Sequence, residues 1–284
     1  TLPTTAAHTR PRPAVLPAPP TCGVTSTSGR RHRGWSAGSG SGSVTSSAAR
    51  SRPVRTAASR SSVTTTGPRA TFTSSAYDGF VLKLSPKGEL TWVKQLGGGG
   101  SQAVRGVEVD DLGNAYLTGY FDTTISIDAT TLDAKDGNDI DFFVAKLDPE
   151  GSTLWASDFG SDSGGEEDND QVALGIAVNG EDNVAITGWF NGTVTTSTNA
   201  STTSSGKRDI FVASIGTGGA MQWFSKFGDG VTQQGRKIAL GDRVYVVGDG
   251  VGSFSIGSNT LDLGSNHADI IAAELTQMNG NPSW

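Results

Sequence analysis

Cysteine is almost absent from this chain, and histidine and long apolar runs are scarce. The single cysteine is Cys22, so no disulfide can hold residues 71–284 together. Only one of the three histidines, His267, lies in that region. We therefore expect neither a Ser-His-Asp triad nor a multi-histidine metal site there. No stretch approaches about 18 consecutive apolar residues, so the sequence contains no candidate transmembrane segment.

Residues 1–70 contain no Asp, Glu, Lys, Ile, Asn, Gln, Phe, Tyr or Met. They hold ten arginines and eight of the eleven prolines, which gives this segment a charge of +10. Residues 71–284 hold twelve basic and 28 acidic residues, a charge of −16, and the two values sum to the net −6. A segment of this composition cannot bury enough apolar surface to offset its conformational entropy, so we predict that residues 1–70 are disordered.

Other interpretations of residues 1–70 remain open. The scattered arginines are compatible with a basic arm for nucleic acid or acidic lipid, although Trp35 is the only Phe, Tyr or Trp among them. No signal peptide is visible, since prolines interrupt the apolar stretch at 14–16, and Cys22 lacks the flanking residues usual for a lipid anchor. The absent residue types are mostly those that GC-rich codons seldom encode, so translation in a wrong reading frame also fits.

A repeat organises the rest of the chain. The sequence Asp-Gly-Phe-Val-Leu-Lys-Leu at 78–84 returns in related form at 141–147, 209–215 and 269–275. Tryptophans recur in step at Trp92, Trp155, Trp223 and Trp284. A second module ends in Thr-Gly-Tyr-Phe at 118–121 and in Thr-Gly-Trp-Phe at 187–190, whereas a third copy reads Val-Gly-Asp at 247–249. Self-similarity at a spacing of about 60–70 residues indicates a repeat architecture.

Each repeat predicts four short antiparallel strands and no helix. Apolar residues alternate in 80–84, and turns with proline second and glycine fourth follow at 85–88 and 148–151. The second predicted strand carries the tryptophan, and Asp/Asn/Gly-rich hairpin turns separate the third strand from the fourth. Four-stranded units at a fixed interval are typical of β-propeller blades, with aromatic rings packed between neighbouring blades.

The fold class predicted is therefore all-β, a partial β-propeller of about three to four four-stranded antiparallel blades. The blades fall at about 78–140, 141–208 and 209–268, with a partial blade at 269–284. Closed propellers carry about four to eight blades, so we expect a fragment or truncated product. Its open end blades are expected to expose apolar faces and to self-associate.

The repeats resemble the bacterial SBBP repeat, named for its seven-bladed β-propeller. The resemblance rests on Asp-Phe-Phe-Val-Ala-Lys-Leu at 141–147, Asp-Pro-Glu-Gly at 148–151, Leu154-Trp155 and Asn-Val-Ala-Ile-Thr-Gly-Trp-Phe at 183–190, and covers about residues 71–284. It implies surface or secreted bacterial proteins, usually without assigned enzymatic activity. The third copy departs from the pattern at Val247-Gly248-Asp249, so that blade is expected to pack less well.

Two acid-rich stretches are candidate calcium sites. Repeat spacing locates an insertion of six residues between 159 and 173. Hard oxygen ligands for Ca²⁺ are plentiful in it, although EF-hand spacing is absent; they are Asp162, Glu166, Glu167, Asp168 and Asp170. A second cluster comprises Asp133, Asp136, Asn138, Asp139 and Asp141. The competing interpretation of both is a solvated acidic loop.

Sequence signals for catalysis are weak. Acid pairs suited to glycoside hydrolysis are not specifically indicated, and sialidases need an arginine cluster, whereas this region has only Arg105, Arg208, Arg236 and Arg243. The glycines at 97–100 lack the Lys-Ser/Thr of a phosphate-binding loop. The turn at 148–155 is similar to the sialidase Asp-box and the quinoprotein tryptophan-docking motif, but its spacing matches neither.

The main functional hypothesis is a non-enzymatic scaffold or binding surface, without a cofactor, in the cell envelope or outside the cell. Its partner would be a protein or glycan, and the charge of −16 disfavours nucleic acid. The alternatives are a fragment of a propeller enzyme of hydrolase or quinoprotein type, with catalytic residues in missing blades, and a calcium-stabilised adhesion module.

Overall fold

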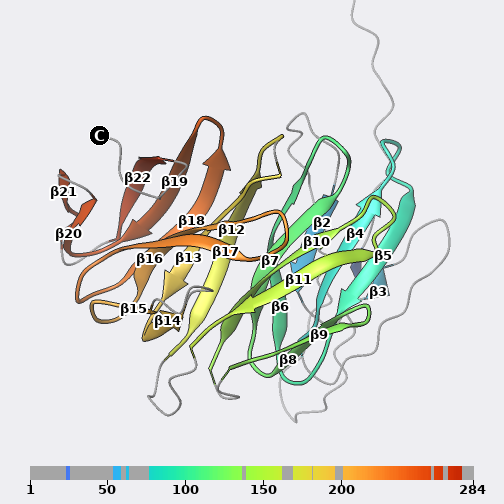
Figure 1. Cartoon of the computed structure of the whole chain (residues 1–284), viewed down its shortest axis with the longest axis horizontal. Coiled ribbons are helices and arrows are strands. Elements are labelled where there is room, and N and C mark those ends of the chain that lie inside the picture. Colours follow the sequence, from blue (N-terminus) through green and yellow to red (C-terminus); the bar gives the residue numbers. More distant parts are fainter. Residues whose placement is uncertain are drawn as a thin grey trace, which may run out of the picture.

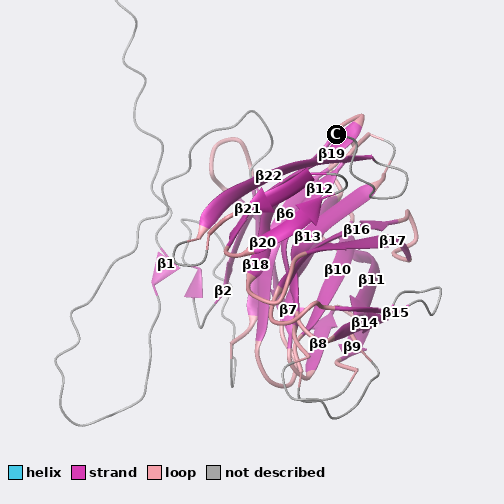
Figure 2. Cartoon of the chain, turned by 90° about the vertical axis from the view of Figure 1, so that its left-hand side faces the viewer, coloured by secondary structure: helices cyan, strands magenta, loops and turns pink. Residues whose placement is uncertain are grey.

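The computed structural model describes residues 77–135, 139–161, 169–180, 182–195, 201–256, 259–264 and 268–276. It also describes the backbone of three short strands before them, β1 (Val24–Thr25), β2 (Val54–Ala58) and β3 (Ser62–Val63). All regular secondary structure in these residues is β-strand (Figure 2). The all-β prediction is therefore confirmed, and this part of the chain contains no helix able to cross a membrane.

Two complete four-stranded sheets form the centre of the molecule. In each sheet the strands are antiparallel and follow the chain order, with one detour between the second and third strands. The first sheet consists of β6 (Gln102–Val109), β7 (Ala115–Phe121), β10 (Asp141–Leu147) and β11 (Thr153–Phe159). The second consists of β12 (Gln171–Val178), β13 (Val184–Phe190), β16 (Asp209–Ile215) and β17 (Met221–Phe227).

A three-stranded sheet lies on each side of this pair (Figure 1). One contains β2, β4 (Gly79–Leu84) and β5 (Leu90–Leu96); the other contains β18 (Gln233–Leu240), β19 (Arg243–Gly250) and β22 (Asp269–Thr276). The first strands of successive sheets contact each other, β6 with β12 and β12 with β18. Sheets that share contacts along their innermost strands are blades of a propeller, so the chain forms a partial β-propeller.

The repeat boundaries of the sequence do not coincide with the sheet boundaries. A repeat counted from Asp78 places β4 and β5 in one sheet and β6 and β7 in the next. The spacing of repeated residues gives the length of a repeat, but it does not show which of its strands pair in one sheet. An antiparallel strand can pair with a neighbour on either side. Each blade therefore takes its two inner strands from one repeat and its two outer strands from the following repeat.

Each repeat also contains a two-stranded hairpin that the sequence pattern did not predict. The three hairpins are β8 (Thr124–Ile127) with β9 (Thr130–Asp133), β14 (Thr193–Thr195) with β15 (Ser201–Thr203), and β20 (Ser253–Ile256) with β21 (Asn259–Asp262). They lie between the second and third strands of each blade. Their apolar residues, among them Ile125, Val194 and Phe254, are buried against the sheets.

Strands β1, β2 and β3 lie in the segment for which the sequence predicts disorder. Strand β2 pairs antiparallel with β4 along its whole length, and β1 pairs with β3. Ladder hydrogen bonds use only backbone groups, so an unpaired strand edge can bind an extended segment of unfavourable composition. The prediction of disorder therefore does not extend to these strands, and the remainder of residues 1–70 lies outside the described residues.

The predicted turns are present. In the turn at 85–88 the Gly88 N–H donates to the Ser85 carbonyl at 2.9 Å, and in the turn at 148–151 the Gly151 N–H donates to the Asp148 carbonyl at 3.0 Å. Both glycines have a positive φ, 84° and 92°. Glycine adopts this conformation without the steric cost that a Cβ would bring.

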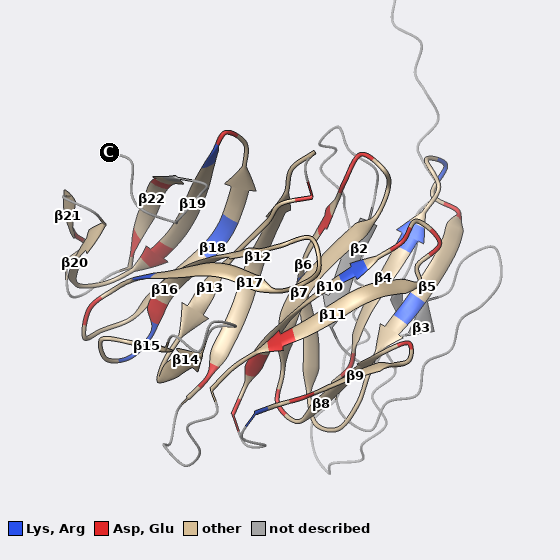
Figure 3. Ribbon diagram, in the orientation of Figure 1, with Lys and Arg blue, Asp and Glu red and all other residues tan. Residues whose placement is uncertain are grey.

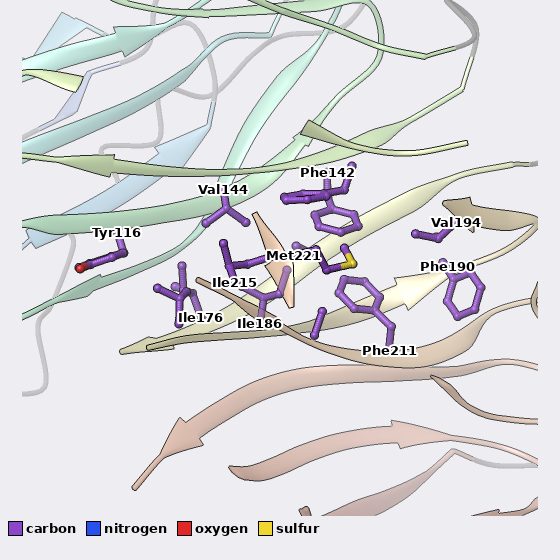
Figure 4. Close-up of a cluster of buried hydrophobic side chains, with 14 residues drawn as sticks. Tyr116, Phe142, Val144, Ile176, Ile186, Phe190, Val194, Phe211, Ile215 and Met221 are labelled. Carbon is purple, nitrogen blue, oxygen red and sulfur yellow. The ribbon is translucent and has the colours of Figure 1, made fainter. Parts of the chain in front are cut away.

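The core consists of apolar layers between successive sheets. All seven residues of β10 and all seven of β13 are buried. Between the two complete sheets, Phe142 of β10 stacks on Phe211 of β16, with ring centroids 5.0 Å apart (Figure 4). The central sheets thus bury both of their faces, as a propeller blade requires.

The repeated tryptophans join neighbouring sheets. Trp92 of β5 lies against Gly151 in the turn of the next sheet, where a Cβ on the glycine would come within 2.9 Å of the ring. The Trp92 Nε1–H donates to the Pro149 carbonyl of the same turn at 3.0 Å. A Cβ on Gly219 of the following sheet would likewise come within 2.8 Å of the Trp155 ring. Glycine is therefore required at this turn for two reasons, its positive φ and the adjacent indole.

Replacing Gly151 by alanine tests this contact, and Gly88→Ala is its matched control. Both positions have a positive φ, so each variant carries a conformational cost of about 1–2 kcal/mol. A Cβ on Gly88 meets no heavy atom within 4 Å, whereas one on Gly151 overlaps Trp92. We expect Gly151→Ala to lower the free energy of unfolding by at least about 1 kcal/mol more than Gly88→Ala, measured by urea denaturation. Equal losses in the two variants would contradict the proposed role of the indole contact.

Candidate functional site

The loops that connect one sheet to the next form a rim at one end of the blades. We define the loop rim as the described residues of the segments 97–101, 160–170 and 228–232, together with the three hairpins. Each hairpin is hydrogen-bonded to the loop beside it. The Ser126 N–H donates to the Gly97 carbonyl at 2.6 Å, and the Ser253 N–H donates to the Asp229 carboxylate at 2.8 Å. Each hairpin and the loop beside it therefore form one connected unit.

A fully buried glutamine anchors each rim loop at the start of an inner strand. Gln102, Gln171 and Gln233 occupy the same position in three repeats and are 0% exposed. Their backbone N–H groups donate to the carbonyls of Tyr77, Ile140 and Arg208 at 2.7, 2.6 and 2.7 Å. These three bonds join the first strand of one sheet to the residues that precede the third strand of the sheet before it.

The glutamine side chains bind the loops themselves. The Gln102 Nε2–H donates to the carbonyl of Thr124 at 2.8 Å, and the Gln233 Nε2–H donates to the Asp229 carboxylate at 2.7 Å. Sequence analysis missed these residues, although a glutamine precedes each third predicted strand. A single polar residue at the start of a strand is as common on an exposed strand as on a buried one, and only the fold shows that these three glutamines are buried.

An aspartate beside each glutamine also supports the rim. Asp141 and Asp209 begin the third strands of their sheets and are buried, at 2% and 0% exposure. Each accepts a backbone hydrogen bond from the segment before it, Asp141 from Lys135 and Asp209 from Ser205, both at 2.8 Å. Burial raises the pKa of Asp209, and one of its carboxylate oxygens accepts no hydrogen bond from the described residues.

The predicted calcium ligands are only partly described. Asp162, Glu166, Glu167 and Asp168 lie outside the described residues. Asp170 is described, and its Oδ1 accepts a hydrogen bond from the Ile140 N–H at 3.2 Å, while its own N–H donates to the Asn191 side chain at 3.0 Å. This carboxylate therefore stabilises the base of its loop.

The second acid-rich cluster meets the first at this base. Ile140 lies between Asp139 and Asp141, so the bond from Ile140 to Asp170 brings the ends of the two acid-rich stretches together. Asp133 is exposed, and Asp136 and Asn138 lie outside the described residues. In the part of the chain that the structure describes, no group of three or more His, Cys, Asp or Glu side chains is arranged to hold a metal ion.

Basic residues are spread over several strands and loops (Figure 3), and the four arginines of the repeat region each contact a different partner. Arg105 lies 5.1 Å from the Tyr120 ring centroid and Arg208 lies 3.8 Å from that of Trp189, both as cation–π contacts. Arg236 pairs with Asp249, and Arg243 pairs with Glu274 at 3.3 Å. Tyr120, Trp189 and Asp249 occupy equivalent positions of the repeat. Three of the arginines therefore contact the same repeat position in successive blades.

A buried ionic network connects the two complete sheets. The Lys146 ammonium lies 3.0 Å from Asp182 and 3.9 Å from Asp110, and the Tyr116 hydroxyl donates to Asp182 at 2.9 Å. The hydrogen bond from Lys146 lowers the pKa of Asp182. Burial and the neighbouring carboxylates raise the pKa of Tyr116, so its hydroxyl stays protonated. The paired charges orient one blade on the next.

A small open pocket lies between the first two sheets and reaches the turn of the β8–β9 hairpin at Asp128. Its volume is about 290 Å³, near the lower limit for small-molecule sites, and its lining comprises Trp92, Val93, Lys94, Asp128, Glu150, Gly151 and Ser152. Lys94 and Asp128 form an ion pair at its edge. The pocket is a by-product of the contact between Trp92 and the turn at Gly151.

Comparisons with known proteins agree with the fold. Residues 91–120 match the family model described as SBBP, beta-propeller repeat, which confirms the resemblance to the SBBP repeat. The chain is also 29% identical over 119 residues to an uncharacterised WD repeat-containing protein of Acanthamoeba polyphaga mimivirus. That match covers 39% of this chain and 8% of the viral protein. The chain therefore contains β-propeller repeats, and it spans only a small part of this relative.

The Lys146 network predicts a large stability loss for Lys146→Met. The substitution leaves Asp110 and Asp182 without their counter-ion, and Asp110 is almost fully buried. We expect a loss of about 2–4 kcal/mol in the free energy of unfolding at neutral pH, less than for a fully buried pair because Asp182 is partly exposed. The matched control is Lys94→Met, whose more exposed pair with Asp128 contributes at most about 1 kcal/mol. Similar losses for both variants would contradict the assignment.

The raised pKa of Asp209 predicts the pH dependence of Asp209→Asn. A carboxyl whose pKa is raised by folding binds its proton more tightly in the folded state, so its ionisation destabilises the fold as the pH rises. Asparagine carries no titrating proton. The wild type should therefore lose stability between about pH 4 and pH 7, whereas the variant does not titrate at this position. The free energy of unfolding of the variant should accordingly rise relative to that of the wild type over this range. Thermal denaturation across this range measures it, and a constant or falling difference would contradict the assignment.

Proposed function

We propose that this chain is a non-enzymatic β-propeller repeat protein whose loop rim binds a protein or glycan ligand, in the cell envelope or outside the cell. Its repeats and its partial propeller carry the coarse assignment. The resemblance to SBBP repeats of bacterial surface and secreted proteins supports the location. The feature that carries the proposed role is the construction of the loop rim.

The rim combines identical anchors with unlike loops. The glutamines at 102, 171 and 233 hold each loop at the same point. Between these anchors the sequences differ, with glycines at 97–100, an acid-rich insertion in 160–170 and Asp-Gly-Val-Thr at 229–232. Recognition surfaces commonly consist of variable loops on a rigid scaffold. A rim of this kind can change its specificity without a change in the blades.

Electrostatics favour a ligand with basic groups. The repeat region carries a charge of −16, and four of its acids lie within residues 162–168. A concentration of one sign of charge raises the association rate of a ligand of the opposite sign, and this effect weakens with salt. The ligand chemistry supported best is a basic peptide segment or an amino-sugar glycan.

Neutralising the four acids of residues 162–168 tests the proposal. In the rim variant Asp162, Glu166, Glu167 and Asp168 become Asn or Gln. The matched control neutralises four exposed acids in the turns at the opposite end of the blades, Glu89, Asp111, Glu150 and Asp242. Both variants lose four negative charges, so any difference between them reflects position and not net charge.

Binding is measured against an array of amino-sugar glycans and lysine-rich peptides at low and high salt. We expect the rim variant to bind at least about tenfold more weakly than the wild type, and the control variant to bind within about twofold of it. Melting temperatures of all three proteins verify that the blades are intact. Equal weakening in both variants, or no binding by the wild type, would overturn the proposal.

A calcium-stabilised adhesion module is the second candidate, favoured by the bond that joins the two acid-rich stretches at Ile140 and Asp170. Titration of EDTA-treated protein with Ca²⁺ in a calorimeter distinguishes it from a metal-free rim. Heat in the wild type that disappears in the rim variant and persists in the control variant would favour this candidate. The absence of heat in the wild type would remove it.

A further inference from the structure

An Asn-Gly pair lies in the turn between β12 and β13. This turn, residues 179–183, joins the first two strands of the second complete sheet at the end of the blades opposite the loop rim. The Asp182 N–H donates to the Asn179 carbonyl at 3.2 Å, and the Asn183 N–H donates to the Asn179 side-chain Oδ1 at 3.1 Å. These bonds hold Asn179 in place and leave Gly180 outside the ladder.

The peptide that follows Asn179 is open to rearrangement. Gly180 is exposed, and its N–H has no hydrogen-bond acceptor among the described residues. A Cβ on Gly180 would meet no heavy atom within 4 Å, and its φ lies outside the left-handed region. Because glycine has no side chain beside its nitrogen, that nitrogen can approach a neighbouring carbonyl carbon with little hindrance.

A second Asn-Gly pair, Asn191 and Gly192, is held by hydrogen bonds on both residues. The Asn191 Oδ1 accepts the Asp170 N–H at 3.0 Å, and the Gly192 N–H donates to the Ser204 hydroxyl at 3.1 Å. Rotation of this peptide breaks these bonds, whereas rotation at Gly180 does not. The chain therefore contains two pairs of identical sequence in different surroundings. A third pair, at 279–280, lies outside the described residues.

We propose that Asn179 is a site of spontaneous deamidation in the folded protein. The Gly180 nitrogen attacks the side-chain carbonyl carbon of Asn179 and forms a C–N bond. The side-chain amide nitrogen then leaves as ammonia, together with the proton that the Gly180 nitrogen gives up. Water opens the resulting cyclic imide. Cleavage of its bond to the side-chain carbonyl gives aspartate, and cleavage of its bond to the main-chain carbonyl gives isoaspartate.

The preceding repeat shows that aspartate fits at this position of the turn. Asp110 is the equivalent residue, and its Oδ1 accepts a backbone N–H from four residues further on at 2.8 Å, as Asn179 accepts one from Asn183. Asp110 also lies 3.9 Å from the Lys146 ammonium, but the next repeat has Ser214 at the position of that lysine. Deamidation to aspartate therefore keeps the turn and adds a negative charge without the equivalent lysine. Isoaspartate instead lengthens the backbone of the turn.

Peptide mapping of the folded chain during incubation at mildly alkaline pH tests the site. A glutamate-specific protease cleaves after Glu181 and places Asn179 and Asn191 in different peptides. We expect aspartate and isoaspartate to form at Asn179 at least about fivefold faster than at Asn191, the factor that corresponds to one ordinary hydrogen bond. Isoaspartate identifies the route through the imide, because direct hydrolysis of the side-chain amide gives aspartate alone.

Gly180→Ala tests the mechanism, and Gly218→Ala is its matched control. Both glycines lie in exposed turns outside the left-handed region, and a Cβ on either would meet no heavy atom within 4 Å. Neither variant should unfold the blades, which melting temperatures verify. The methyl group of Gly180→Ala hinders attack by the adjacent nitrogen, so most of the product at Asn179 should be lost. Gly218→Ala should form it at the wild-type rate.

The proposal is overturned if Asn191 reacts as fast as Asn179, or if Gly180→Ala reacts as fast as the wild type. An equal loss of product in Gly180→Ala and Gly218→Ala would contradict the assigned attack by the Gly180 nitrogen. A synthetic peptide of residues 175–185 provides the chemical reference. An Asn179 that stays intact in the folded chain while this peptide deamidates would show that the turn protects the site, and would overturn the proposal as well.

Discussion

Burial of both faces of each sheet is the constraint on which the rest of this structure depends. Strands such as β10 and β13 carry apolar residues on both sides, so a single sheet cannot satisfy them. A stack of sheets buries these faces only when each member has two neighbours. The packing between blades, the tryptophans against the turns at Gly151 and Gly219 and the exposed apolar residues of the third sheet all follow from this requirement. The blade is therefore not a unit of stability by itself.

The buried polar residues allow the apolar stack of sheets to carry loops that differ in sequence. Gln102, Gln171 and Gln233 are buried, and their side-chain N–H groups donate to backbone, amide or carboxylate oxygens of the loops, so each loop has a defined start. These bonds offset only part of the desolvation cost, because the Oε1 atoms of Gln102 and Gln171 accept no hydrogen bond from the described residues. The Lys146 network has a similar role between blades, where paired charges accept only one relative position of Asp182. Apolar layers supply most of the stabilisation, and these few polar contacts determine register and loop placement.

Much of the fold could be predicted from the sequence, because alternation, turn chemistry and repeat spacing all act locally. The turn at Asp148 and Gly151 and the strand with Phe142 and Phe143 are visible as patterns of adjacent residues. The hairpin at Thr124–Ile127 was missed because four residues cannot establish a period against the loops on either side. The anchoring glutamines were missed because burial depends on partners far away in sequence. The candidate metal ligands were identified by composition alone, and of the set in 162–170 only Asp170 is described.

The phase difference between repeat and blade has a consequence for assembly. Because each blade takes its inner strands from one repeat and its outer strands from the next, consecutive repeats cannot separate without breaking a sheet. Covalent continuity thus reinforces the contacts between blades inside the chain, whereas an end face depends on side-chain contacts alone. The rim is anchored on the first strand of each sheet. Such a strand contacts the first strands of the preceding and following sheets, as β12 contacts β6 and β18. A ligand bound at the rim would therefore contact loops from several blades, and its binding would depend on how those blades are held together.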